Sequence, residues 1–290
     1  MAHLYWHKKR LTILTPKIKS LPDDHRFGPG CLYQLSRLFG SVGNYVEEKR
    51  LLARALTIRR ERGSDHSVGR TLMELSNVNW SIGLYKEGIQ QAEEASEIFE
   101  RLGDTGNQAH CLVRLAHSLC SNERLDAAEG AALRAIDLLP DKGQEFRVCE
   151  SHRALGNIYQ SKGDTKKAVH HFEAAIGIAT PFNWHGVLFW LHYELVAPLR
   201  GEGRFDDIQA NIEHAKSHTA SNAYYLGCAM ELQARVWYDQ HRLKEAKSEA
   251  LRTTDVFEKL GAARDLERCR TLLRGIEKRL NTPVASGQSD

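Results

Sequence analysis

The sequence predicts an all-α protein, a right-handed superhelical solenoid built from antiparallel helix pairs. Residue types recur in register about every 40 residues, the apolar residues inside each period follow helical spacing, and runs of β-branched residues between turn clusters are absent. A single helix pair cannot bury its own apolar stripe, so we expect the repeated pairs to stack into one continuous array.

The register is clearest in a column of leucines in the first helix of each repeat. Steps of 40 residues in both directions from Leu155 reach the other members, Leu35, Leu75, Leu115 and Leu195. An alanine recurs in the second helix, at Ala55, Ala95, Ala135, Ala175 and Ala215. We expect the leucines to lie in the core and the alanines to lie where the second helix presses closely on a neighbour.

A glycine after the first helix marks the turn inside most repeats. Four repeats carry it, at Gly43, Gly83, Gly163 and Gly203. Glycine readily adopts the left-handed backbone that ends many helices, so these positions predict tight turns. Glu123 replaces the glycine in the third repeat, which leaves the geometry of that turn open. Asp164 follows Gly163 and is a good N-cap for the second helix of its repeat.

The breaks between repeats divide the chain into six predicted helix pairs. They are assigned to residues 30–63, 64–103, 104–143, 144–183, 184–221 and 222–262, and the last step shortens to 38 residues. We interpret residues 1–29 as an N-terminal partial helix or cap, 263–280 as a C-terminal capping helix and 281–290 as a disordered tail. The unfinished N-terminal edge predicts a truncated array or a fragment of a longer protein.

Composition argues against several classes of function. A net charge of +3 is too small to favour nucleic acid or an anionic membrane as partner. The chain has no run of about 18 apolar residues that could span a membrane, and no secretory signal. The six cysteines form no C-x-x-C pair, which favours a reducing compartment and a cytoplasmic protein.

The patterns expected of enzymes and metal proteins are missing. His214 and His218 are four residues apart and would form half of a metal site, but no third ligand and no H-E-x-x-H motif accompany them. No nucleophile elbow of the G-x-S-x-G type is present either. We therefore predict no enzymatic activity, no metal and no cofactor, with an enzyme assembled from distant residues as the least favoured alternative.

The repeat columns resemble the tetratricopeptide repeat, in a longer subtype of about 40 residues. The segments YKEGIQQAEEASEIFERLGD, RLDAAEGAALRAIDLLP and AMELQARVWYDQHRLKEAKSEALR are similar to the C-terminal repeat arrays of fungal NACHT or STAND NTPases. This resemblance covers residues 4–278 and implies the ligand-sensing array of a signalling protein. The phosphate-binding motif G-x-x-x-x-G-K-[ST] is absent, so the motor domain of such proteins is not part of this sequence.

In tetratricopeptide arrays the first helices line the concave face, and the resemblance implies the same placement here. The register then gives the candidate peptide-binding residues Tyr33, Arg37, Arg70, Asn77, His110, Arg114, His117, Arg153, Asn157, Trp190, Tyr193 and Arg235. Arginine pairs with carboxylates, and asparagine can hydrogen-bond a peptide backbone. We expect this face to bind a protein or peptide through an acidic or C-terminal segment.

Two alternatives stay open at this point. Each arginine could instead pair with a glutamate of a neighbouring helix, such as Glu74, Glu150 or Glu194, although the recurrence of arginine in five repeats favours a binding face. For the whole chain, the predicted function is a protein–protein interaction module. A self-associating structural scaffold or adaptor is the alternative.

Overall fold

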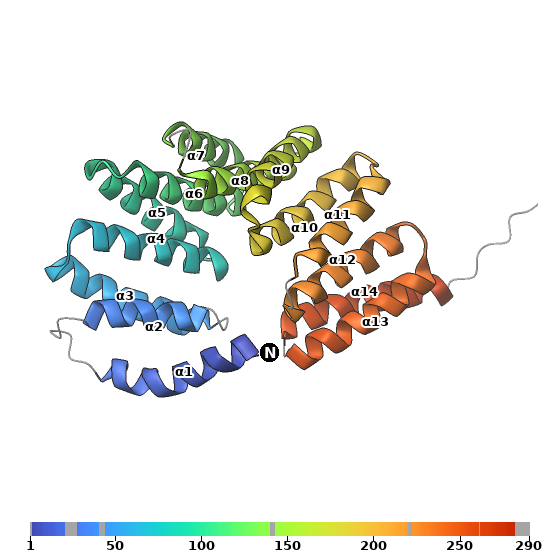
Figure 1. The fold of residues 1–290 in the computed structure, drawn as a ribbon, viewed down its shortest axis with the longest axis horizontal. Helices are drawn as coiled ribbons and strands as arrows, with labels where there is room; N and C mark the ends of the chain where they lie inside the picture. Colours follow the sequence, from blue (N-terminus) through green and yellow to red (C-terminus); the bar gives the residue numbers. More distant parts are fainter. Residues whose placement is uncertain are drawn as a thin grey trace, which may run out of the picture. The chain divides into compact units, whose positions relative to one another are not determined.

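The computed structural model describes residues 2–20, 28–40, 44–139, 143–219, 222–260 and 262–281. Within these ranges the chain is helical and contains no strand (Figure 1), which confirms the predicted all-α class. Most of the predicted tail, residues 282–290, lies outside the described residues. The chain divides into two compact units, residues 1–179 and residues 180–290, and each is described by itself.

Unit 1 consists of a first helix followed by four antiparallel helix pairs. Its helices are α1 (Ala2–Lys19), α2 (Gly28–Gly40), α3 (Tyr45–Arg62), α4 (Asp65–Ser81), α5 (Tyr85–Arg101), α6 (Thr105–Ser121), α7 (Leu125–Asp137), α8 (Glu145–Lys162) and α9 (Thr165–Ala179). We refer to the even-numbered helices α2 to α8 as the A helices of this unit, because each is the first helix of its pair.

Unit 2 continues with two helix pairs and a last helix. It begins with a short 3-10 turn (Thr180–Phe182), and its helices are α10 (His185–Gly201), α11 (Phe205–Ser217), α12 (Ala223–Asp239), α13 (Leu243–Leu260) and α14 (Ala263–Asn281). Each predicted repeat range holds most of two helices, and the predicted capping segment falls on α14. The division into six repeats stays an interpretation of the sequence.

The recurring apolar residues lie in the core of both units. The five leucines of the repeat column are at most 9% exposed, and the five recurring alanines are fully buried. This confirms the expectation that the leucines form the core and that the alanines lie at close helix contacts. A side chain larger than alanine at these positions would overpack the interface, by about 1–3 kcal/mol.

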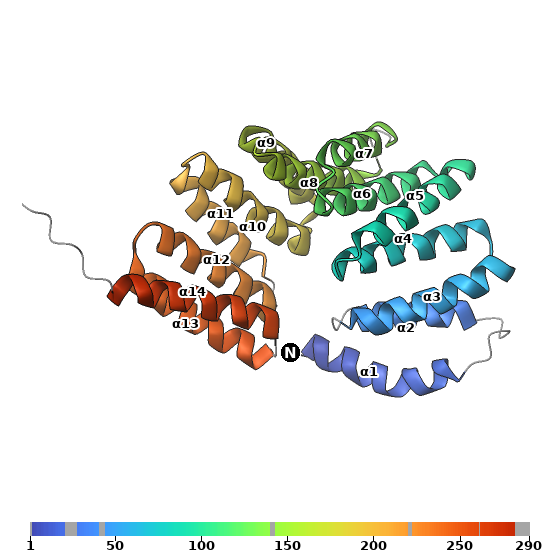
Figure 2. The same ribbon diagram turned by 180° about the vertical axis from the view of Figure 1, so that it is seen from behind.

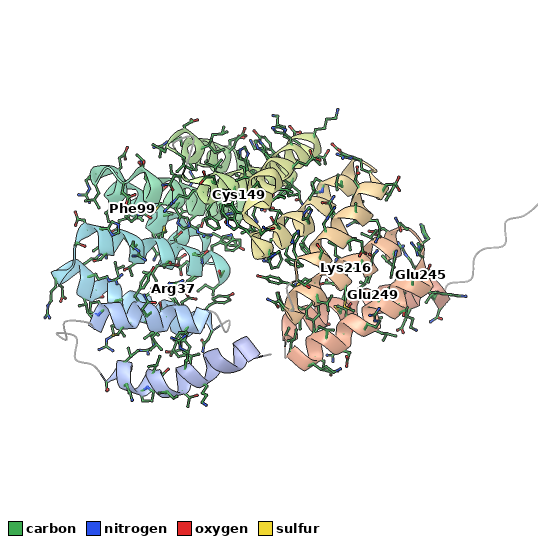
Figure 3. The ribbon with its side chains drawn as sticks, viewed as in Figure 1. Arg37, Phe99, Cys149, Lys216, Glu245 and Glu249 are labelled. Atoms are coloured by element: carbon green, nitrogen blue, oxygen red, sulfur yellow. The ribbon has the colours of Figure 1, made fainter. Side chains whose placement is uncertain are left out.

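Small residues also let phenylalanine rings lie directly against a neighbouring helix. A Cβ atom added at Gly156 of α8 would meet the ring of Phe172 of α9 at 2.8 Å, and one added at Gly227 of α12 would meet Phe257 of α13 at 2.8 Å. Phe99 of α5 packs in the same way near Gly69 of α4 and belongs to the core of unit 1 (Figure 3). These contacts set the spacing of the two helices in these three pairs.

The turns inside the pairs have the predicted left-handed backbone. The φ angles are +81° at Gly83, +79° at Gly163 and +70° at Gly203, whereas Gly43 lies outside the described residues. Glu123 has a φ of +61° and therefore keeps the same turn although it carries a side chain. Asp164 accepts a hydrogen bond at 3.1 Å from the backbone N–H of Lys167, which confirms it as an N-cap.

Replacing Glu123 with glycine tests this turn. We expect Glu123→Gly to raise the free energy of unfolding by about 1 kcal/mol, because a left-handed backbone disfavours residues with a Cβ atom and glycine removes that strain. Gly163→Ala, at the equivalent turn, should lower it by a similar amount. Urea unfolding of the two variants and the parent chain measures both changes, and a destabilised Glu123→Gly variant would contradict the expectation.

Candidate functional site

The A helices of unit 1 form a continuous surface. α4 contacts α6, and α6 contacts α8, so their corresponding positions lie next to each other (Figures 1 and 2). We call the polar part of these three helices the A-helix surface. It comprises the predicted residues Arg70, Asn77, His110, Arg114, His117, Arg153 and Asn157, together with Glu74 and Glu150.

Arg114 lies at the centre of this surface, on α6. Its Nη2 is 3.1 Å from Nε2 of His110, one helical turn earlier. A guanidinium has only donors, so the Nε2 atom of His110 must accept this hydrogen bond and the imidazole proton must sit on Nδ1. Within the described part of the chain, no carboxylate oxygen lies within 4.0 Å of the Arg114 guanidinium. The charges of Glu150 and Glu74 act on it only from a greater distance.

Two neutral imidazoles flank this guanidinium. Burial, followed by the positive charge of Arg114, lowers the pKa of His110 to about 3. Burial, followed by the charges of Arg114 and Arg153, lowers the pKa of His117 to about 3 as well. The ring of Trp80 on α4 lies 5.7 Å from the His117 ring, between centroids. The centre of the surface is therefore a positive charge among neutral hydrogen-bonding groups, next to an aromatic ring.

Arg153 brings a second positive charge from α8. Its Nη1 lies 3.7 Å from Oε1 of Glu150, so the alternative of pairing with a glutamate applies to this arginine. The glutamate belongs to the same helix, however, and not to a neighbour. Asn157 follows Arg153 by one helical turn and is half-buried.

Tyr33 is in a different position from the one expected of a ligand contact. It is 4% exposed and donates its hydroxyl hydrogen to Oε1 of Glu74 at 3.0 Å, so it is part of the packed interior. The guanidinium of Arg70 lies 5.6 Å from the Tyr33 ring, and that of Arg59 lies 4.9 Å from it. Burial, followed by the charge of Glu74, raises the pKa of nearby Glu48 to about 7.

Two candidates of unit 1 remain, one on α2 and one on α4. Arg37 is exposed on α2 (Figure 3), and Asn77 is half-buried on α4. Their roles as ligand contacts stay predictions. From the sequence, Glu74 was expected only as a competing partner for an arginine. In the structure, it accepts the hydroxyl hydrogen of Tyr33.

The candidates of unit 2 are two half-buried aromatic residues and one arginine in an ion pair. Trp190 and Tyr193 are half-buried on α10, with ring centroids 5.5 Å apart, in an aromatic cluster with Phe189 and Tyr225. Arg235 on α12 forms an ion pair at 2.8 Å with Glu231, a carboxylate that is 1% exposed. Glu231 is a functional candidate that the sequence analysis did not single out.

The histidine pair considered as half of a metal site lies in a stack of rings. The ring of His192 is 5.0 Å from that of His214 and 5.8 Å from that of His218, between centroids. In the part of the chain that the structure describes, no three histidine, cysteine or acidic side chains are arranged to hold a metal ion. The six cysteines are free thiols, and none of the described helices is both long and apolar enough to cross a membrane.

Known proteins share this architecture. Residues 151–180, on α8 and α9, match the tetratricopeptide repeat family. A Rap protein complexed with competence and sporulation factor is similar over 94% of this chain and 80% of its own, with a TM-score of 0.69 and 15% identity. Aspartyl phosphate phosphatase F from Bacillus subtilis is similar over 89% of this chain and 72% of its own, with a TM-score of 0.62 and 11% identity. No curated protein sequence matches the chain.

A third similar structure is a STAND protein, a signal transduction ATPase with numerous domains, from Pyrococcus horikoshii, which has a tetratricopeptide repeat sensor. It matches 88% of this chain but only 39% of its own length, with a TM-score of 0.64 and 13% identity. The fold defines the chain as an α-helical repeat protein. The chain therefore has the fold of a tetratricopeptide-like helical solenoid, and one of its segments matches the tetratricopeptide repeat itself.

The two half-buried imidazoles predict a loss of stability in acid. Between pH 7 and 5 the unfolded chain takes up protons near the ordinary histidine pKa of about 6.5, whereas folded His110 and His117, with pKa values of about 3, do not. The free energy of unfolding should therefore fall as the pH decreases, by about 2 kcal/mol per imidazole at pH 5.

The double variant His110→Gln/His117→Gln should remove this part of the pH dependence. Thermal unfolding of the parent chain and the variant at both pH values measures the difference. His170→Gln, at an exposed histidine of α9, is the matched control and should retain the dependence of the parent chain. A double variant that loses as much stability in acid as the parent chain would contradict the prediction.

Proposed function

We propose that this chain is a protein-interaction module that binds an acidic peptide segment of a partner on the A-helix surface of unit 1. The observation that carries the proposal is the Arg114 guanidinium, which is half-buried next to a neutral imidazole and has no carboxylate within 4.0 Å in the described part of the chain. A partly desolvated charge without a counter-charge costs several kcal/mol. A ligand carboxylate that reaches Arg114 would offset that cost.

The surroundings of Arg114 support the same class of ligand. Arg153 and Arg70 add positive charge on the two neighbouring helices, and guanidinium groups bind carboxylates through two parallel hydrogen bonds. Asn77 and Asn157 offer amide groups on the same surface, which can hydrogen-bond an extended peptide backbone. Trp80, which is 39% exposed, offers an apolar contact beside the charged centre.

A sensor role is the more specific form of this proposal. It is supported by the sequence resemblance to repeat arrays of fungal NACHT or STAND NTPases, and by the similar fold of a STAND protein that has a tetratricopeptide repeat sensor. In such a protein, peptide binding would bias the arrangement of a neighbouring domain. The proposal assigns the chain a binding role and no catalytic one, in the cytoplasm, with no cofactor.

Binding of a labelled acidic peptide tests the proposal. The double variant Arg114→Glu/Arg153→Glu should weaken binding at least about tenfold, because each lost charge-assisted hydrogen bond contributes about 1.5–3 kcal/mol. Fluorescence anisotropy with a peptide rich in aspartate and glutamate measures the dissociation constants. Circular dichroism shows whether the variant keeps its helices, and Arg114→Gln provides a milder change at the same position.

The matched control separates a specific site from general attraction. Arg50→Glu/Arg60→Glu changes the net charge by the same amount, at two exposed arginines of α3 in the same unit. We expect it to bind almost as well as the parent chain. Equal affinities of the parent chain and the Arg114→Glu/Arg153→Glu variant would remove the proposed site. Light scattering over a range of protein concentrations tests the alternative of a self-associating scaffold.

A further inference from the structure

Unit 2 contains a pocket of its own. It has a volume of about 480 Å³ and is lined by residues of α12 and α14, among them Arg235, Tyr238, Arg268, Thr271, Leu272 and Gly275. This volume lies within the range of pockets that hold small molecules. One side of the pocket is charged, and the rest consists of an aromatic ring, an aliphatic side chain and backbone at a glycine.

A buried carboxylate holds the two arginines of the pocket in place. Glu231 accepts hydrogen bonds at Oε1 from Nε and Nη2 of Arg235, at 3.1 and 2.8 Å. It also accepts hydrogen bonds from Nε and Nη2 of Arg268, at 3.2 and 2.6 Å. Because Glu231 is 1% exposed, solvent does not compete for these hydrogen bonds. Hydrogen bonds from both arginines lower the pKa of Glu231 despite its burial, so it stays ionised.

This arrangement leaves one group of donors unused. A guanidinium has five N–H donors. The Nη1 atom of Arg268 bonds to Asp265 at 2.7 Å, whereas the Nη1 atom of Arg235 makes no hydrogen bond to any described residue. Arg235 is therefore held in a fixed position while its outer N–H groups remain available to a ligand. The hydroxyl of Thr271 accepts from Arg274 at 2.9 Å and lies at the same pocket.

Two arginines, Arg235 and Arg268, line the pocket. Arg279 lies over the ring of Tyr238, with its Cζ atom 4.0 Å from the ring centroid. Glu267 also lines the pocket, but it is paired with Arg274 at 2.8 Å. Glu231, which both lining arginines share, is the other carboxylate at this site. The Nη1 atom of Arg235 is therefore the donor that an anion would meet, in a pocket that the ring of Tyr238 and the side chain of Leu272 also line.

We propose that this pocket binds a small carboxylic acid with an apolar body. The carboxylate would accept hydrogen bonds from Nη1 of Arg235, and the apolar body would lie against Tyr238, Leu272 and the backbone at Gly275. Such a ligand matches both sides of the pocket, whereas a purely polar anion would leave the apolar wall unused. The proposal does not depend on peptide binding in unit 1, and the two can fail separately.

The probe for this site is 3-phenylpropionate, with its uncharged amide as the ligand control. In an NMR titration observed on the ligand, the acid should bind the full chain and the amide should bind at least about tenfold more weakly. Arg235→Gln should weaken binding of the acid by a similar factor. Gly275→Leu, which keeps both arginines and places a side chain in the pocket, should abolish it.

Two further variants serve as controls, because each changes an arginine that does not line the pocket. Arg252→Gln removes an arginine that is paired with a largely buried glutamate, Glu249, on α13, and it should bind the probe like the parent chain. Arg114→Gln alters only unit 1 and should also leave probe binding unchanged. The pocket proposal is overturned if the parent chain does not bind the acid, if Arg235→Gln binds it equally well, or if Arg114→Gln abolishes the binding.

Discussion

The close approach of a glycine to a phenylalanine ring is the contact on which three of the helix pairs depend, α4 with α5, α8 with α9 and α12 with α13. Gly156 meets Phe172 between α8 and α9, and Gly227 meets Phe257 between α12 and α13, with no room for a Cβ atom at either glycine. Because interiors pack at near-crystalline density, these contacts determine how far apart the two helices lie and how the first helix is rotated. That rotation decides which polar side chains reach the surface of the unit.

The two units stabilise their partly buried arginines in different ways. In unit 1, Arg114 has a neutral imidazole as its hydrogen-bond partner, and the flanking histidines stay uncharged because burial and nearby arginines oppose their protonation. In unit 2, Glu231 is a common acceptor for Arg235 and Arg268. In the described part of the chain, the first arrangement leaves the guanidinium with no carboxylate within 4.0 Å, and the second positions one arginine so that its Nη1 donors stay open.

Much of the local structure follows from patterns that neighbouring residues create. Helical spacing of apolar residues identifies the buried side of each helix, so Leu155 and its column could be placed in the core from the sequence. The turn at Gly163 was predictable because glycine favours a left-handed backbone. The pairing of His110 with Arg114 also follows from sequence, because residues four apart lie side by side on a helix.

Contacts between helices were not predictable in this way. Tyr33 shares the register of a surface residue, but it is buried in a cluster with Leu52, Leu75 and Val78. Glu74, 41 residues later, accepts its hydroxyl hydrogen. Arg268, on α14, reaches Glu231, 37 residues earlier in the chain, and lines the pocket in unit 2. The sequence by itself determined the helices, their buried sides and their turns, because these depend on local spacing. Only the tertiary structure decided which charges meet, because that depends on the distance between packed helices and on side-chain rotamers.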